Sequence, residues 1–231
     1  MCDRYVSPTI AEMERYWALS DVQRARLIGG YDRHNIMPPA PVPIIFMGEE
    51  ESEMCLARWG LVPPRWRQPK LPPSTFNARI EDAATQPIWR QAVKNARCLI
   101  PAIGWYEWQP TLTVDTITGE MKVVMNQPYF LHLPGRQVFA FAGLMSRWTA
   151  AGSDAAIFTT AIVTRAAEGP AAEIHTRMPL ILPKDAEAAW LNRRQTDGET
   201  ALREARTAAV TNVLHHAAGS RGNHPLRAFA D

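Results

Sequence analysis

The stretch RCLIPAIGWYEW, residues 97–108, decides how the fold is interpreted. It reads as two short strands, Arg97–Pro101 and Trp105–Trp108, because its apolar, β-branched and aromatic side chains are those enriched in sheets. The second strand carries one carboxylate, Glu107, among aromatic neighbours. From this stretch onward the pattern is mostly β.

Downstream, Thr118-Gly119 predicts a turn between two strands, 111–117 and 120–124. Three more strands are expected from their composition. They are Tyr129–Leu133, Val138–Leu144 and Ala156–Thr164. A short helical stretch is expected at 166–174 and a strand at 180–182. Residues 183–191 and 199–206 have a helical pattern, and a last strand is expected at 208–214.

Upstream, Ser7-Pro8 resembles the start of a helix, and apolar residues at helical spacing extend the prediction to about Ile28. An extended loop is expected over 31–39, because its prolines disfavour helix in the residues before them. Strands at 42–47 and 55–59 and a helix at 82–93 follow. We therefore expect one α+β domain over residues 1–231, with peripheral helices around a strongly curved or barrel-like, mainly antiparallel sheet. A mobile tail is expected from about His215.

Composition excludes several classes of protein. The 231 residues are 46% hydrophobic and 21% charged, which indicates a globular protein, and no apolar stretch is long enough to span a bilayer. No signal-peptide pattern is present, so a cytoplasmic protein is expected, nucleoid-associated if bacterial. Three cysteines without CxxC spacing and scattered histidines argue against a disulfide framework or a metal site, and no cofactor is expected.

The net charge of +2 predicts no partner by itself. Of the 25 basic residues, however, 21 are arginine and four are lysine. Arginine is suited to bidentate phosphate recognition. A genome-wide bias towards alanine and arginine would give the same count.

The residue after the initiator methionine, Cys2, has unusual chemistry available to it. Once Met1 is removed, it carries a free α-amine and a thiol, with ordinary pKa values of about 8 and about 8.5. An amine forms a Schiff base with an aldehyde, and the neighbouring thiol can then close a five-membered thiazolidine on the same carbon. The alternative is an ordinary mobile chain terminus.

A second candidate region combines Trp59 and Trp66 with Arg58, Arg65 and Arg67. Aromatic rings beside cations on a loop suit stacking on unpaired bases and contact with a phosphate backbone. The alternative is a loop whose tryptophans cover the core.

Five separated motifs occur in one order along the chain. They are Met1-Cys2-x-Arg4, Trp59-Gly60, Asn77-Ala78-Arg79, Gly104-Trp105-Tyr106-Glu107-Trp108 and Ile174-His175-Thr176-Arg177-Met178-Pro179. Together they resemble the SOS response-associated peptidase family, whose members capture abasic sites in single-stranded DNA. The resemblance runs from residue 1 to about Val213.

The resemblance implies a thiol autopeptidase that releases Met1 and then forms a covalent crosslink to DNA through Cys2. Asn77 would hold the N-terminal region or the opened sugar, and Glu107 and His175 would transfer protons. Phosphates would meet Arg4, Arg79 and Arg177, and displaced bases would meet Trp66 and the Pro38 loop. The implied partner is single-stranded DNA containing abasic sites, and a monomer is expected.

The chemistry of these residue types is compatible with the implied roles. An abasic deoxyribose is mostly a closed hemiacetal, so an acid and a base must help to open it. Aromatic neighbours would desolvate Glu107 and raise its pKa, and histidine titrates near neutrality. The alternatives are a surface carboxylate on an alternating strand and a structural histidine.

Some positions depart from the family pattern. Asp3 stands where a glycine is common, Ile80-Glu81-Asp82 and Ile103 differ from the expected residues, and Thr176 replaces an acid beside His175. The last change removes one charge partner for the imidazole, although Glu173 is close in sequence.

Two rival functions follow from the same residues. One is a cysteine peptidase acting on proteins, with Cys2, His175 and Asn77 as a thiol–imidazole–amide arrangement. The other is a module that binds single-stranded DNA through arginine and tryptophan without a covalent bond.

Overall fold

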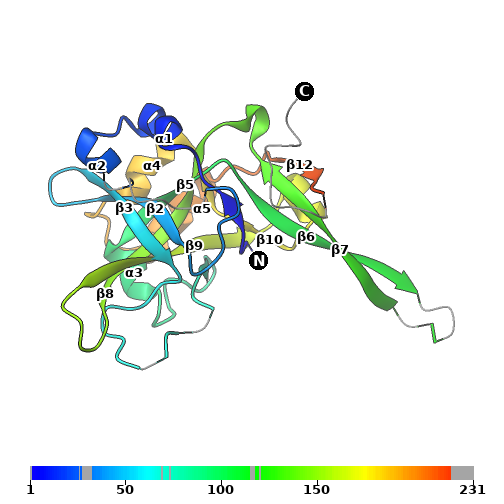
Figure 1. Cartoon of the computed structure of the whole chain (residues 1–231), viewed down its shortest axis with the longest axis horizontal. Coiled ribbons are helices and arrows are strands. Elements are labelled where there is room, and N and C mark those ends of the chain that lie inside the picture. The colour runs from blue at the N-terminus through cyan, green and yellow to red at the C-terminus, as the bar shows by residue number, and fades with distance from the viewer. Residues whose placement is uncertain are drawn as a thin grey trace.

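The computed structural model of the chain describes residues 2–25, 27, 33–68, 70–72, 74–114, 118–119 and 121–219. Its centre is a ring of five strands (Figure 1). The ring contains β2 (Pro41–Met47), β3 (Ser52–Trp59), β5 (Arg97–Ala102), β8 (Phe139–Thr149) and β9 (Ala156–Ala166). Each strand pairs with the next in the order β9–β3–β2–β5–β8, and β8 pairs back onto β9. Only the β3–β9 pairing within this ring is parallel, so the expected barrel-like, mainly antiparallel sheet is confirmed.

Three short strands extend the ring at one end. β4 (Asn77–Arg79) runs parallel to β9, and β10 (Arg177–Pro179) pairs antiparallel with the same strand. β11 (Ile181–Leu182) pairs with β8. Thr164 of β9 faces Arg79 in β4 and Pro179 in β10, so these two short strands flank the end of β9.

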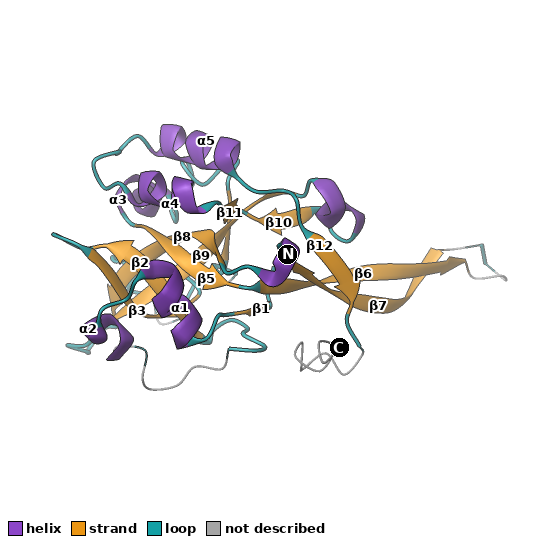
Figure 2. Cartoon of the chain, turned by 90° about the horizontal axis from the view of Figure 1, so that it is seen from above, coloured by secondary structure: helices purple, strands orange, loops and turns teal. Residues whose placement is uncertain are grey.

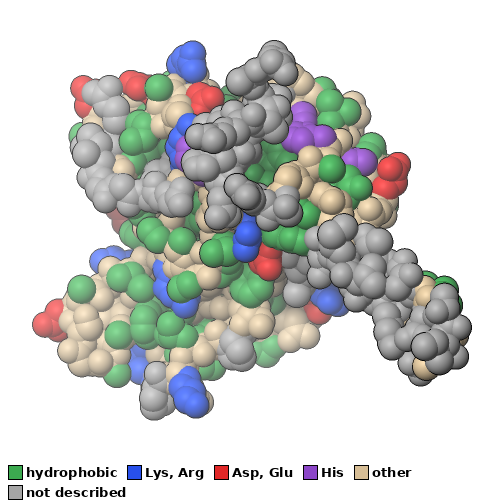
Figure 3. All heavy atoms as spheres, turned by 45° about the vertical axis from the view of Figure 1, so that its right-hand side comes forward, with side chains coloured by type: hydrophobic (Ala, Val, Ile, Leu, Met, Phe, Trp, Pro, Cys, Tyr) green, Lys and Arg blue, Asp and Glu red, His purple; other side chains and the backbone are tan. Residues whose placement is uncertain are grey.

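A second sheet contains β1 (Tyr5–Val6), β6 (Gly104–Val114), β7 (Met121–His132) and β12 (Leu214–Ala217) in the order β1–β6–β7–β12. The β6–β7 hairpin is long and projects away from the barrel (Figures 1 and 2). At the base of this hairpin, position 104 has room only for glycine. A Cβ there would lie 2.2 Å from Cζ of Phe130 and 2.6 Å from the carbonyl oxygen of Leu131. Histidine side chains reach the surface on this side of the molecule (Figure 3), where β12, which contains His215 and His216, lies along β7.

The aromatic core fixes the N-terminal strand to the barrel. The ring of Tyr5 meets Trp59 edge-on at 5.3 Å and Phe141 at 5.8 Å between centroids. All three side chains are fully buried. Because aromatic burial dominates core energetics, β1 is an integral part of the fold.

The helices cover the outside of the barrel (Figure 2). They are α1 (Ile10–Trp17), α2 (Asp21–Ala25), α3 (Arg90–Asn95), α4 (Lys184–Leu191) and α5 (Gly198–Ala208), with short 3-10 helices at Pro134–Arg136 and Gly169–Glu173. Thr9 caps α1 and exchanges hydrogen bonds with Glu12, a capping box. The indole nitrogen of Trp17 at the other end donates to the buried Glu187 of α4 at 2.9 Å, which ties the two helices together.

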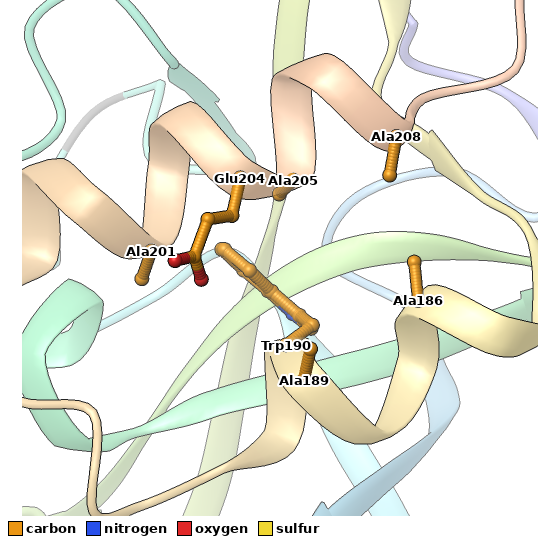
Figure 4. A pocket seen from close by; sticks show the side chains of 7 residues that line it. All are labelled: Ala186, Ala189, Trp190, Ala201, Glu204, Ala205 and Ala208. Carbon is orange, nitrogen blue, oxygen red and sulfur yellow. The ribbon is translucent and has the colours of Figure 1, made fainter.

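Helices α4 and α5 meet across small side chains and leave a hollow of about 240 Å³ (Figure 4). It is lined by Ala186, Ala189, Trp190, Ala201, Glu204, Ala205 and Ala208. None of the residues predicted for catalysis lines it. We attribute the hollow to alanine packing between the helices.

The structure differs from the sequence prediction in several elements. The expected helix from Ser7 to Ile28 is two helices, because Ala18 takes a left-handed conformation with φ of 51° and ends α1. The expected helix at 82–93 is a series of turns followed by α3. The expected last strand at 208–214 and mobile tail from about residue 215 are wrong in position, since Leu214–Ala217 pair with β7 as β12. The rest of the expected tail, from residue 220, lies outside the described residues.

Within the described ranges no helix combines the length and the apolar character needed to cross a lipid bilayer.

Candidate active site

The N-terminal segment is held on both sides. Tyr5 and Val6 pair with Trp105 and Gly104 of β6, and on the other side Tyr5 exchanges two backbone hydrogen bonds with Ile36. Cys2, three residues before this strand, is only 1% exposed. The segment is therefore ordered, and the alternative of a mobile terminus is wrong for Cys2.

Asn77 holds the backbone of Cys2. It is the first residue of β4, and its side-chain Nδ2 donates a 2.7 Å hydrogen bond to the carbonyl oxygen of Cys2. Its own side chain is buried. Since the pairing of β4 with β9 fixes this amide, the position of Cys2 is determined by the barrel.

Glu107 lies in β6, two residues beyond the pairing partner of Tyr5. The neighbouring Tyr106 donates its backbone N–H to the carbonyl oxygen of Arg4 at 2.9 Å, which brings this part of β6 against the N-terminal segment. Glu107 is only 2% exposed, so the alternative of a surface carboxylate is wrong. Burial raises the pKa of Glu107 to about 7, the charge of the amino terminus opposes that rise, and Asp3 adds to it. A carboxyl group with this pKa exchanges protons near neutrality.

The Cys2 thiol is protonated in this environment. Burial raises its pKa well above the ordinary value, and the negative charges of Glu107 and Asp3 raise it further. The exposed Asp3 thus acts electrostatically on both candidate groups. A base must take the thiol proton before the sulfur can react, because the thiolate is the nucleophile.

His175 follows the 3-10 helix Gly169–Glu173 and is half-buried. Its Nδ1 lies 2.9 Å from the backbone nitrogen of Arg177 and 3.2 Å from the carbonyl oxygen of the same residue. The shorter contact has an N–H donor facing Nδ1, so in the neutral ring we assign the proton to Nε2. Burial lowers the pKa of His175, as do the charges of the amino terminus and Arg177, whereas a hydrogen bond with the Arg177 backbone and the charge of Asp3 raise it. The same N-terminal charges therefore act on His175 and Glu107.

Glu173 does not take the place of the acid missing at Thr176 in the described contacts. Its carboxylate lies 3.4 Å from Nε2 of His215, and its backbone oxygen accepts from Gln109. It therefore ties the segment before His175 to β12 and β6.

The three predicted phosphate-binding arginines have different surroundings. Arg4 is half-buried, with its guanidinium 4.9 Å from the ring centroid of Trp108. Arg79 is exposed at the end of β4. Arg177 has a 14% exposed side chain and forms a two-point salt bridge to Glu81, at 2.7 and 3.0 Å. Arg79 is thus the most accessible of the three, and Arg177 already has an anionic partner.

The two residues predicted to contact bases lie in loops. Pro38 is half-buried two residues after Ile36, the backbone partner of Tyr5, so its loop lies next to the N-terminal strand. Trp66 is half-buried, donates through its indole nitrogen to the Lys70 carbonyl and accepts from the Trp148 indole through its own carbonyl. The contacts described for Trp66 do not include the residues around Cys2.

Sequence reasoning missed the partners of Arg177. Glu81 was noted only as a departure from a pattern, and Thr164 was not singled out. Thr164 accepts from the same guanidinium through its carbonyl and its hydroxyl oxygen, at 2.8 and 3.2 Å. No local signal predicts these contacts, because Glu81 and Arg177 are 96 residues apart. Across the described ranges, no group of three or more His, Cys, Asp and Glu side chains is placed to hold a metal ion.

Comparisons with known proteins identify the family of this chain. A family model described as SOS response associated peptidase (SRAP) matches residues 1–218. The abasic site processing protein YoqW of Bacillus subtilis is 30% identical over 164 residues, which are 71% of this chain and 68% of that protein. The abasic site processing protein YedK of Escherichia coli is 28% identical over 215 residues, 91% of this chain and 87% of that protein.

The fold has a counterpart among solved structures as well. A crystal structure of a protein from Bacteroides thetaiotaomicron superposes with a TM-score of 0.77 at 21% identity, over 97% of both chains. At that identity the likeness concerns the fold. With the family model matching nearly the whole chain, this protein belongs to the SOS response associated peptidase family.

Proposed function

We propose that this protein captures abasic sites in single-stranded DNA as a covalent thiazolidine through Cys2, after Met1 has been removed. The observation that carries the proposal is the fixed position of Cys2, 1% exposed and held through its carbonyl by Asn77. The names of the relatives YoqW and YedK, both abasic site processing proteins, support the substrate.

The first step is removal of Met1, for which we propose the protein's own thiol site. Hydrolysis of the Met1–Cys2 peptide bond consumes one water and leaves the α-amine on Cys2. The amine and the thiol then belong to one residue. Asn77 holds the carbonyl of that residue and not its amine, so this contact can persist after cleavage.

The second step opens the abasic sugar. His175 donates a proton to the ring oxygen as the C1′–O bond breaks, and Glu107 accepts the proton of the C1′ hydroxyl. The product is the open aldehyde. A group that titrates at about pH 7, as Glu107 does, can perform this transfer in both directions.

The third step forms the crosslink. The α-amine adds to the aldehyde carbon, and Glu107 gives the proton that it took in the second step to the departing hydroxyl, which leaves as water; the products are the iminium and the Glu107 carboxylate. The sulfur then adds to the same carbon while Glu107 takes the thiol proton, and the nitrogen becomes neutral because it receives the electron pair of the C=N bond and keeps its hydrogen. One water is released for each crosslink, and the new bonds are C1′–N and C1′–S.

The contacts of Asn77 favour this function over a peptidase acting on other proteins. In a thiol–imidazole–amide arrangement the amide orients the imidazole. Here the Asn77 Nδ2 donates to the Cys2 carbonyl, and His175 Nδ1 meets the backbone of Arg177. The Asn77 amide therefore positions Cys2, whereas the backbone of Arg177 orients the imidazole of His175.

Intact mass measurement tests the proposal. Protein lacking Met1, mixed with single-stranded DNA containing one abasic site, should give one species whose mass is the sum of both minus one water. Cys2→Ser should give no heat-stable band on a denaturing gel, and Cys55→Ser, which changes a half-buried cysteine of β3, should crosslink normally. A crosslinked species that retains Met1, or a stable band with Cys2→Ser, would rule out the thiazolidine. The same abasic strand annealed to its complement tests whether crosslinking requires single-stranded DNA.

A further inference from the structure

The ion pair between Glu81 and Arg177 joins the two segments that carry the site. Glu81 lies two residues beyond the end of β4, whose first residue is Asn77. Arg177 begins β10, two residues after His175. The carboxylate receives one hydrogen bond from each terminal nitrogen of the guanidinium, at 2.7 and 3.0 Å. Thr164 of β9, which lies between the two short strands, binds the same guanidinium.

A second contact continues this connection to the imidazole. The backbone N–H of Arg177 donates to Nδ1 of His175 at 2.9 Å. A displacement of Arg177 would therefore move the hydrogen bond that sets the orientation and the tautomer of the ring. Bidentate arginine–carboxylate pairs are geometrically specific, which suits them to fixing such a position.

We propose that Glu81 is a positioning residue of this active site: through its ion pair with Arg177 it fixes His175 relative to Asn77 and Cys2, and it balances the cationic charge beside the imidazole. The effect on catalysis rests on the proposed function, whereas the effect on His175 itself does not.

A purely stabilising role explains the ion pair less well. The Glu81 side chain is 43% exposed, and exposed ion pairs contribute little to folding. Arg177, by contrast, is mostly buried and uses its terminal nitrogens on Glu81 and Thr164. The arrangement therefore determines the position of the guanidinium more than it stabilises the domain.

The charges around His175 predict the direction in which its pKa changes when Glu81 is neutralised. Burial, the charge of the amino terminus and the guanidinium charge of Arg177 lower the pKa of His175, whereas the hydrogen bond with the Arg177 backbone and the charge of Asp3 raise it. Glu81 partly neutralises Arg177, and the guanidinium in turn lowers the pKa of Glu81 despite the opposing effect of burial. Without the carboxylate, the unbalanced charge of Arg177 would lower the pKa of His175 further.

The test compares Glu81→Gln with Glu168→Gln. Glutamine keeps the shape of Glu81 and loses its charge. Glu168 is a matched control, because its carboxylate also forms an ion pair with an arginine, Arg165 of β9. The Glu168 side chain is 50% exposed, close to the 43% of Glu81. NMR titration of the His175 ring in the absence of DNA should show a lower pKa in Glu81→Gln and no change in Glu168→Gln.

Crosslinking kinetics provide the second measurement. At saturating protein and pH 7, Glu81→Gln should form the crosslink about tenfold more slowly, and the limb of the pH profile that needs protonated His175 should move to lower pH. Glu81→Asp, which retains the charge, should restore the titration of His175 at least in part. Binding of intact single strands should not weaken, because Arg177 loses an anionic partner.

A double variant tests the route through Arg177. In an Arg177→Gln background, adding Glu81→Gln should leave the His175 titration unchanged, since no guanidinium remains to be balanced. An unaltered titration in Glu81→Gln alone, or an equal change in Glu168→Gln, overturns the proposal. If the wild-type protein forms no crosslink, the proposed function fails, and the titrations still decide the role of Glu81.

Discussion

At the scale of single residues, Glu107 has the environment that a proton-transfer group needs. It is buried beside the N-terminal segment, and its pKa of about 7 keeps both protonation states populated near neutral pH. We expect Glu107→Gln to bind abasic single strands with near-normal affinity and to form the crosslink slower by about 10²-fold or more. Stopped reactions at saturating protein measure the rate, and equilibrium binding measures the affinity.

The pH profile of the same variant gives an independent check. In the wild-type protein the rate should rise as Glu107 ionises around pH 7. That rise should be absent from Glu107→Gln. A variant that loses affinity and keeps its rate would assign Glu107 to structure, and another base would be needed.

Arg79 is the most exposed of the three predicted phosphate contacts. We expect Arg79→Ala to weaken binding of intact and abasic strands alike and to reduce the slope of log affinity against log salt by about one. Titrations at two salt concentrations measure this. Arg90→Ala, an exposed arginine in α3, is the control and should leave the slope unchanged. A loss confined to abasic strands would contradict a phosphate contact.

The candidate residues at the site fall in short motifs and could be selected from the sequence, whereas the partners of Arg177 could not. Cys2, Asn77 and Glu107 come together as expected. The pairing of Arg177 with Glu81 joins residues far apart in sequence, and nothing in either local stretch selects the other. The sequence therefore indicates Arg177 as a candidate residue but not the residues that contact its guanidinium.

At the scale of elements, β1 shows how a two-residue strand can position chemistry. Its backbone is paired with β6 on one side and with Ile36 on the other, so it lies inside the fold. A residue before Cys2 turns the α-amine into an amide, which forms no Schiff base. N-terminal position is thus a chemical requirement of the proposed crosslink.

We therefore expect any permanent N-terminal extension to abolish crosslinking, whereas the same tag at the C-terminus should be tolerated. Denaturing gels of both tagged proteins with abasic single strands measure this, and removal of the N-terminal tag to leave Cys2 first should restore activity. Equal rates for blocked and unblocked protein would contradict the requirement for the amine.

The strands were easier to predict than the helices and the ring. Alternating and β-branched segments placed most strands close to their observed positions, because side-chain pattern follows the two faces of a sheet. The helix after Ser7 was predicted too long, since its apolar spacing continues while the left-handed Ala18 ends it. Closure of the ring depends on the parallel pairing of Arg58 and Trp59 with Thr159 and Thr160, a non-local contact that local pattern does not encode.

At the scale of the whole molecule, the buried carboxyl group makes stability depend on pH. Glu107 binds its proton more tightly in the folded chain than in the unfolded one, where its pKa is near 4.5. Its favourable contribution is therefore fully present below pH 4.5 and is lost as the pH rises through about 7. For this shift the loss is about 3 kcal/mol.

We expect Glu107→Gln to raise the free energy of unfolding at pH 8 and to have little effect near pH 5. Urea unfolding at both values measures this, with Glu50→Gln at an exposed position as the control. A difference between wild type and Glu107→Gln that is the same at both pH values would contradict the raised pKa. If Glu107→Gln is more stable and less active, Glu107 follows the trade-off between stability and activity that is common at active sites.

The burial of Cys2 also bears on how the protein is made. Cys2 leaves the ribosome well before its enclosing partners Asn77 and Glu107 have been synthesised. Because folding during synthesis proceeds from the N-terminal side, the thiol stays accessible until β6 has joined β1. After that point a reagent or an enzyme reaches the enclosed sulfur only through local unfolding. The speed of translation through residue 107 thus sets how long the thiol is exposed to other molecules in the cell.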